Sequence, residues 1–165
     1  MGTAKDLFIT GLKNAHAMEN QAHEMLERQA ERMTDYPELR QRAAEHLKET
    51  KQQLARLEKC LTDAGSSPST IKDATLAFGA NMAAMGHAMA KDEVLKNAFA
   101  SNALENFEIA AYKSLLALAD AAGFPQMKAP LETSLAEEER MAKWMDSHIQ
   151  PITLEFLRVE EKAAA

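Results

Sequence analysis

The stretch Ala17-Met18-Glu19-Asn20 recurs in the second half of the chain as Ala103-Leu104-Glu105-Asn106. A second acidic stretch follows each copy: Leu47-Lys48-Glu49-Thr50 follows the first, and Leu135-Ala136-Glu137-Glu138-Glu139 follows the second. In these stretches carboxylates stand beside alanine and leucine, which favour helices. The chain therefore contains an internal repeat in which each half carries two acidic helical segments.

A proline separates the two acidic segments of each half, Pro37 in the first and Pro125 in the second. Each half is therefore expected to form a helix, a turn and a second helix. Two such hairpins packed together would direct carboxylates from all four helices into a common interior. Buried carboxylates repel one another, and a multivalent cation between them relieves that repulsion. The repeat thus predicts a dinuclear metal site inside a four-helix bundle.

The composition favours an all-α fold in a single domain spanning residues 1–165. Of the 165 residues, 46% are hydrophobic but only 5% are aromatic, and alanine, leucine and methionine supply most of the apolar share. Residues that favour strands are sparse by comparison. The four long helices are expected close to residues 4–33, 37–64, 92–122 and 126–151.

Two further helical segments are expected outside these ranges. Residues 70–90 read as a long crossover containing a short helix, because a bundle of two hairpins needs a connection along its length. Met82, Met85 and Met89 in this crossover match helical spacing and are interpreted as packing residues rather than soft-metal ligands. Pro151 is expected to kink or stop the fourth helix, so that a short C-terminal helical segment follows it.

The charge and the single cysteine narrow the classes of partner. A net charge of −6 and a pI near 5.4 exclude the basic surface that a nucleic-acid partner requires. Cys60, the only cysteine, fits a reducing compartment and is either an ordinary buried residue or a reactive thiol. No secretory signal is visible, and the uncharged residues 74–90 are too weakly apolar to span a membrane. We therefore expect a cytoplasmic protein.

The candidate metal ligands interrupt apolar helical stripes. Glu19 falls within a stripe of small and aliphatic residues, and Glu105 and Glu108 occupy neighbouring positions on one face of the third helix. His46 precedes Glu49 by three residues, and an imidazole and a carboxylate at this spacing can bind one cation. Carboxylate-rich sites with some imidazole suit iron or manganese. The third helix is expected to direct inward Leu95, Ala98, Phe99, Asn102, Glu105, Ile109, Tyr112 and Leu116.

The ligand pattern departs from the usual one, and other interpretations remain open. Di-iron bundles usually carry Glu-x-x-His on two helices. Here Gln52 and Gln53 follow Glu49, and Met141 follows Glu138, so both expected histidines are missing. A glutamate on an alanine-rich helix is most often simply solvated. Tyr112 either donates a hydrogen bond to a ligand carboxylate or is only a buried aromatic residue.

With these motifs in view, the chain resembles the YciE/YciF family of ferritin-like proteins over nearly its whole length, from about residue 6 to 157. The matching stretches include Asn14-Ala15-His16-Ala17-Met18-Glu19, Tyr36-Pro37-Glu38-Leu39-Arg40, His46-Leu47-x-Glu49-Thr50, Ser69-x-Ile71-Lys72-Asp73, Asp92-Glu93-Val94-Leu95-Lys96, Phe107-Glu108-Ile109-Ala110-x-Tyr112 and Met141-Ala142-x-Trp144. The resemblance implies a ferritin-like four-helix bundle with an added helical segment, a homodimer and a role in bacterial stress.

Position by position, the resemblance implies a set of metal ligands: Glu19, Glu49, Glu105, Glu108 and Glu138, with His46 as the sixth. Gln53 stands where relatives of the wider bundle class have histidine. The leading hypothesis is a stress-related protein that binds two metal ions, iron or else manganese, and reacts with dioxygen or peroxide. The alternative is a structural or partner-binding helical dimer with a vestigial site. A ferritin-type mineral store is disfavoured, because a dimer has no closed shell.

Overall fold

Four long helices make up most of the part of the chain that the structure, a computed structural model, describes: residues 2–66 and 93–164. They are α1 (Ala4–Arg32), α2 (Pro37–Asp63), α4 (Glu93–Ala121) and α5 (Lys128–Ala164), with a short 3-10 helix η1 (Pro125–Met127) before α5. The first three long helices end within two residues of the predicted limits. The short helix predicted within residues 70–90 lies outside the described residues.

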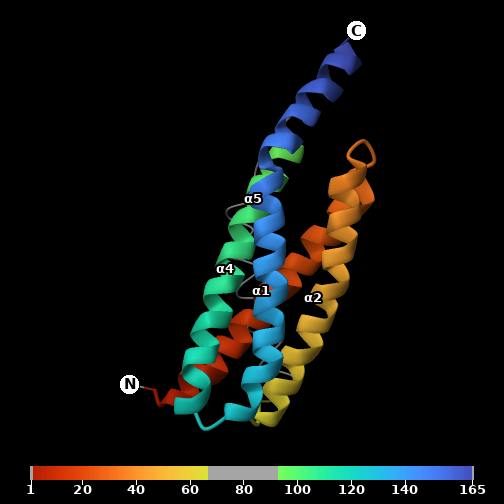
Figure 1. Cartoon of the computed structure of the whole chain (residues 1–165). Helices are drawn as coiled ribbons and strands as arrows, with labels where there is room; N and C mark the ends of the chain where they lie inside the picture. The colour runs from red at the N-terminus through yellow and green to blue at the C-terminus, as the bar shows by residue number, and fades with distance from the viewer. Residues whose placement is uncertain (1, 67–92, 165) are drawn as a thin grey trace.

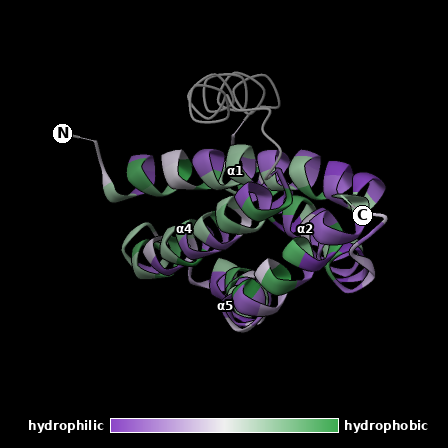
Figure 2. Ribbon diagram, turned by 90° about the horizontal axis from the view of Figure 1, so that it is seen from above, coloured by the Kyte–Doolittle hydropathy of each residue, from purple (hydrophilic) through white to green (hydrophobic). Residues whose placement is uncertain are grey.

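The four helices form two hairpins packed side by side. α1 packs on α2 and α4 on α5, while α1 also contacts α4 and α2 contacts α5, which closes the bundle. Figure 1 shows α2 ending and α4 beginning at opposite ends of the bundle. Seen from above, α1 and α5 lie on opposite sides with α2 and α4 between them (Figure 2). The predicted all-α four-helix bundle is confirmed.

Local signals explain where the helices begin and end. Thr3 caps α1 in a reciprocal arrangement: the Asp6 amide donates to Thr3 Oγ1 over 3.2 Å, and the Thr3 amide donates to Asp6 Oδ2 over 2.8 Å. Pro37 occupies the first turn of α2, where its missing N–H costs nothing. Gly65 and Gly123 follow α2 and α4 with φ of +83° and +82°, the left-handed conformation that favours glycine after a helix.

The fourth long helix passes through Pro151 without ending. α5 remains helical to Ala164, so the predicted C-terminal segment is a continuation of α5 rather than a separate helix. Figure 1 shows this last part of α5 leaning away from the bundle axis. Pro151 is exposed, and water can therefore satisfy the backbone carbonyl that the proline leaves without a partner. Ile152, the next residue, is buried in the apolar core at this end.

The interior has three layers along the bundle. One end is an apolar cluster that includes Phe8, Leu12, Leu57, Leu61, Tyr112 and Leu131, and the other includes Met33, Leu39, Ala98, Met141, Met145 and Ile152. Between them lies a buried polar layer containing Glu19, His46, Gln53, Glu105, Glu108 and Glu138. The two apolar ends therefore shield the polar layer from water.

The inward face of α4 differs slightly from the prediction. Its buried residues recur at spacings of three and four: Ala98, Ser101, Leu104, Glu105, Glu108, Tyr112, Leu115 and Ala119. Phe99 falls beside this stripe and is 51% exposed, so its predicted inward position is wrong. One residue step turns a helix by about 100°, which is enough to move a side chain out of the core. No helix in the described ranges is both long and apolar enough to cross a membrane.

Candidate metal centre

Acidic and imidazole side chains from all four long helices meet in the polar layer. α1 contributes Glu19, α2 contributes His46, α4 contributes Glu105 and Glu108, and α5 contributes Glu138. Each is at most 1% exposed. Thus the structure brings five of the six residues predicted as ligands into one buried layer.

Three of these side chains already have the geometry of a metal-binding group. His46 Nε2 lies 3.3 Å from Glu105 Oε2 and 3.4 Å from Glu138 Oε2. One potential ligand atom from each of the three residues lies within 4.8 Å of the others. Imidazole nitrogen and carboxylate oxygen are the ligand types of carboxylate-bridged iron and manganese sites. This buried group can therefore bind a metal ion.

The sixth predicted ligand, Glu49, lies at the edge of the layer instead of inside it. Its Oε2 accepts a hydrogen bond from His46 Nδ1 over 2.9 Å, and its Oε1 accepts one from Arg140 Nη2 over 2.9 Å. The hydrogen bond from His46 holds the pKa of Glu49 down at about 2 against the effect of partial burial, and Arg140 adds to this. In this arrangement Glu49 contacts the outer nitrogen of the histidine, while the inner nitrogen faces the other carboxylates.

Tyr112 supports one of the inner carboxylates. Its hydroxyl donates to Glu19 Oε1 over 2.6 Å, and the tyrosine is completely buried. Of the two interpretations left open by the sequence, the structure therefore favours a hydrogen bond that orients a candidate ligand.

Gln53 is a member of the layer that the predicted ligand set lacked. It is completely buried, and its Nε2 donates to Glu137 Oε2 over 3.0 Å and also to Glu138 Oε1. Glu137 in turn forms a two-point ion pair with Arg56, with N–O distances of 2.6 and 2.8 Å. The signal for Gln53 was present in the sequence, because it lies seven residues after His46 and so on the same helix face.

Burial dominates the electrostatics of the inner carboxylates. It raises the pKa of Glu19 and of Glu108 well above the ordinary range, and Glu138 and Glu19 respectively add to the effect as neighbouring carboxylates. Burial likewise raises the pKa of Glu105 to about 8, although His46 partly offsets it. Without a cation, several of these groups must therefore hold protons near neutral pH.

The pKa values of His46 and Glu138 each shift in the direction opposite to the effect of burial. Burial alone would lower the pKa of His46, yet hydrogen bonds to Glu105, Glu138 and Glu49 raise it well above its ordinary value. Burial would raise the pKa of Glu138, but hydrogen bonds from His46 and from a protonated Glu105 lower it. In the metal-free form, hydrogen bonds donated by these protonated groups therefore stabilise the layer.

Several buried oxygens in this layer lack a hydrogen-bond donor among the described residues. They include Glu19 Oε2, Gln53 Oε1 and both oxygens of Glu108. Buried polar atoms are nearly always satisfied in folded proteins, and these are all acceptors that face a carboxylate-rich interior. Cations satisfy acceptors of this kind directly. The residues present therefore fit a metal site.

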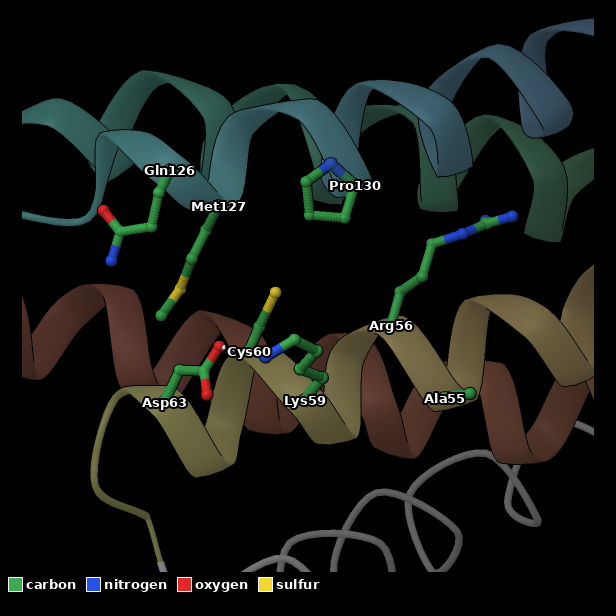
Figure 3. Close-up of a pocket in the computed structure, with 8 residues that line it drawn as sticks. All are labelled: Ala55, Arg56, Lys59, Cys60, Asp63, Gln126, Met127 and Pro130. Atoms are coloured by element: carbon green, nitrogen blue, oxygen red, sulfur yellow. Dashed lines mark hydrogen bonds and ion pairs between the residues drawn. The ribbon is translucent and has the colours of Figure 1, made fainter.

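A separate pocket of about 430 Å³ opens between α2 and the start of α5. Figure 3 shows Cys60 reaching from α2 toward the side formed by η1 and α5, with Arg56 at one edge. Burial raises the pKa of the Cys60 thiol to about 11. The thiolate, which is the reactive form, is therefore scarce near neutral pH, and the structure favours an ordinary buried cysteine.

Comparisons with known proteins agree with the fold. A protein from Xanthomonas campestris pv. campestris is 31% identical, with a TM-score of 0.79 and coverage of 97% of this chain and 99% of that chain. YcfI from Rhodopseudomonas palustris is 27% identical, with a TM-score of 0.68 and coverage of 88% and 94%. The E. coli stress protein YciF is 21% identical, with a TM-score of 0.68 and coverage of 93% and 98%, and supports the fold alone.

A family model also matches nearly the whole chain. The family is described as a domain of unknown function, DUF892, and its model covers residues 3–158. Together with the YciF-like structures, this match confirms the resemblance predicted from the sequence. The chain belongs to the DUF892 family of YciE/YciF-type helical proteins.

Proposed function

We propose that this protein binds two divalent metal ions, iron or manganese, inside its four-helix bundle and uses them in a stress response. The observation that carries the proposal is the buried layer of carboxylates whose acceptor oxygens have no hydrogen-bond donor among the described residues. Glu19, Glu105, Glu108 and Glu138 would hold the ions as anionic ligands, together with His46. The stress role rests on the likeness to YciF, which is described as a stress protein.

The charge of the layer supports two ions rather than one. The four inner carboxylates carry four negative charges when ionised, and two divalent cations balance them. The two outer carboxylates have separate partners, since Glu49 pairs with Arg140 and Glu137 with Arg56. With a single divalent ion, two of these carboxylates would still have to hold protons near neutral pH to avoid buried negative charge.

The surrounding residues suit reactions with a small oxidant. When bound, a pair of redox-active ions would supply electrons to dioxygen or peroxide. Around it, Tyr112 orients Glu19, Glu49 orients His46, and the apolar clusters at both ends of the bundle exclude water. A small neutral oxidant can enter such a site, whereas a large or charged substrate cannot do so without opening the bundle.

Elemental analysis of untagged protein purified without chelators tests the proposal. We expect close to two iron or manganese atoms per chain, and substantially less in Glu108→Gln and Glu138→Gln, which each remove one buried carboxylate. Glu139→Gln is the matched control, because Glu139 neighbours Glu138 but is exposed and pairs with Lys113 over 3.0 Å. A metal content near zero that persists after anaerobic loading with ferrous iron would contradict the proposal.

One observation favours the second candidate function, a structural homodimer with a vestigial site. Phe99 and Phe107 are 51% and 56% exposed on α4, and exposed aromatic residues are typical of protein contacts. YcfI, one of the similar proteins, is described as a candidate structural protein. Sedimentation of the wild type and of a Phe99→Ser, Phe107→Ser variant tests this assembly. A wild-type dimer that dissociates in the variant, combined with absence of metal from both, would favour the structural function.

A further inference from the structure

Two chains of hydrogen bonds with the same chemical order approach the carboxylate layer from outside. In the first, Arg140 from α5 binds Glu49, which accepts a hydrogen bond from His46. In the second, Arg56 from α2 binds Glu137, which accepts a hydrogen bond from Gln53. Each chain thus runs from an arginine through a carboxylate to a buried side chain that donates a hydrogen bond from nitrogen.

Each outer carboxylate accepts a hydrogen bond from one nitrogen of its buried partner, which leaves the partner's other polar atom available to a metal ion. Glu49 accepts a hydrogen bond from His46 Nδ1, so Nε2 is the nitrogen that faces Glu105 and Glu138 and that would bind an ion once its own proton is displaced. Glu137 accepts a hydrogen bond from Gln53 Nε2, so the carbonyl oxygen Oε1 occupies the other position of the amide. Oε1 is buried and receives no hydrogen bond from any described residue.

His46 and Gln53 also contact opposite oxygens of one carboxylate, that of Glu138. His46 Nε2 lies near Glu138 Oε2, and Gln53 Nε2 donates to Glu138 Oε1. They are seven residues apart on α2, a rise of about 10 Å along the helix. Glu138 therefore lies between His46 and Gln53, where it would contact an ion held by either side chain.

We propose that Glu49 and Glu137 are positioning residues that present His46 Nε2 and Gln53 Oε1 as ligands, one for each of the two metal ions. This inference rests on the proposed function and adds Gln53 to the ligand set. A carboxylate that accepts the outer N–H of a metal-bound imidazole fixes the ring and its tautomer. Glu137 does the same for an amide, because its negative charge favours the NH₂ end of Gln53 over the oxygen.

The arginines keep the two outer carboxylates out of the layer. Arg56 contacts both oxygens of Glu137 and also donates to Ser134 Oγ over 3.0 Å, and such two-point pairs hold a carboxylate in one orientation. Arg140 donates to Glu49 and to the Ala136 carbonyl. Since Arg56 and Arg140 each neutralise one carboxylate, the positioning residues add no net charge to the site.

Cobalt(II) titration of metal-free protein, followed by visible absorption and calorimetry, tests the assignment. We expect the wild type to bind two ions, and Glu137→Gln and Glu49→Gln each to weaken a different one of them by about 10–100-fold. In a Gln53→Leu background the ion next to residue 53 has already lost its ligand, so Glu137→Gln should cause no further loss. If Glu137 had a purely structural role, Glu137→Gln would instead lower the affinity for both ions, and the loss would also occur in the Gln53→Leu background.

Two controls keep the titration decisive. Glu139→Gln makes the same change at the neighbouring exposed position and should bind both ions like the wild type. Glu137→Asp keeps the charge beside Arg56 but shortens the side chain. If Glu137→Gln does not fold, Glu137→Asp is used in its place, and the same loss of affinity for one ion is expected. If the wild type binds two ions and Glu137→Gln or its replacement binds them equally well, the inference is wrong while the proposed function stands. If the wild type binds none, both fail.

Discussion

Glu108 shows how strongly a single residue constrains the interior. Both of its oxygens are buried, and no hydrogen bond to either is donated by a described residue. Burial keeps its pKa far above the ordinary range, and Glu19 adds to this shift. Because the folded protein must hold a proton on Glu108 that the unfolded chain releases at neutral pH, this carboxyl group reduces the stability of the metal-free protein.

The variant Glu108→Gln measures that cost. The amide is neutral at every pH, whereas folding forces a proton onto Glu108 that the unfolded chain releases at neutral pH, so we expect the metal-free variant to be more stable by at least about 1.4 kcal/mol, the equivalent of one unit of pKa shift. Urea unfolding of both proteins in the presence of a chelator gives the difference. A clear loss of stability would mean that Glu108 contributes to the fold in a way that the metal site does not explain.

The stability of the metal-free protein should fall as the pH rises from about 5 to 8. Glu105 has a pKa of about 8 in the folded protein against an ordinary value of 4.5, so the folded state binds more protons than the unfolded state between these values. Stability falls with pH wherever the folded state binds more protons. The raised pKa of His46 acts in the same direction, because the stability it contributes is lost as the pH rises through its folded-state pKa.

Thermal unfolding in chelator at several pH values between 5 and 8.5 measures this dependence. With metal bound, the cations displace the protons, and the decline in stability should disappear. A metal-free protein that becomes more stable between pH 5 and 8 would contradict the assigned protonation.

At the scale of helices, the sequence was sufficient for most boundaries, because caps and turns are local signals. Thr3 with Asp6, Pro37, Gly65 and Gly123 each mark an end in the sequence and in the structure. The course of α5 through Pro151 was not predictable, since it depends on the exposure of the proline and on the packing of the following residues.

Gly123→Ala tests the C-terminal stop of α4. The left-handed conformation of Gly123 is disfavoured for a side chain, although nothing lies within 4 Å of the position that a Cβ would take. We expect a loss of about 1 kcal/mol from backbone strain alone. Gly123→Asn is the matched control and should lose less, because asparagine tolerates this conformation better. Chemical denaturation measures both. Equal losses would indicate an effect other than backbone conformation.

The ligand set could be predicted from helix faces only in part. Glu19, His46, Glu105, Glu108 and Glu138 fall on inward faces, and periodicity alone identifies such faces. Glu49 and Gln53 both lie on the inner side of α2, and their actual roles depend on Arg140 and Glu137 of a different helix. A contact between helices distant in sequence leaves no local signal.

At the scale of the whole molecule, the bundle is an apolar–polar–apolar stack. Hydrophobic burial at the two ends stabilises the fold and isolates the carboxylates from water. That isolation makes the charges costly without a cation and strengthens their attraction to one when it is present. The same arrangement of helices thus makes ionised carboxylates unfavourable in the metal-free interior, which is the physical basis of the proposed metal binding.

Anomalous diffraction from crystals of the manganese-loaded protein tests the central claim most directly. The account predicts two peaks between α1, α2, α4 and α5, one beside His46 and Glu105 and the other beside Gln53, with Glu138 touching both. An interior without a peak, with the same carboxylates bonded only to one another, would contradict it.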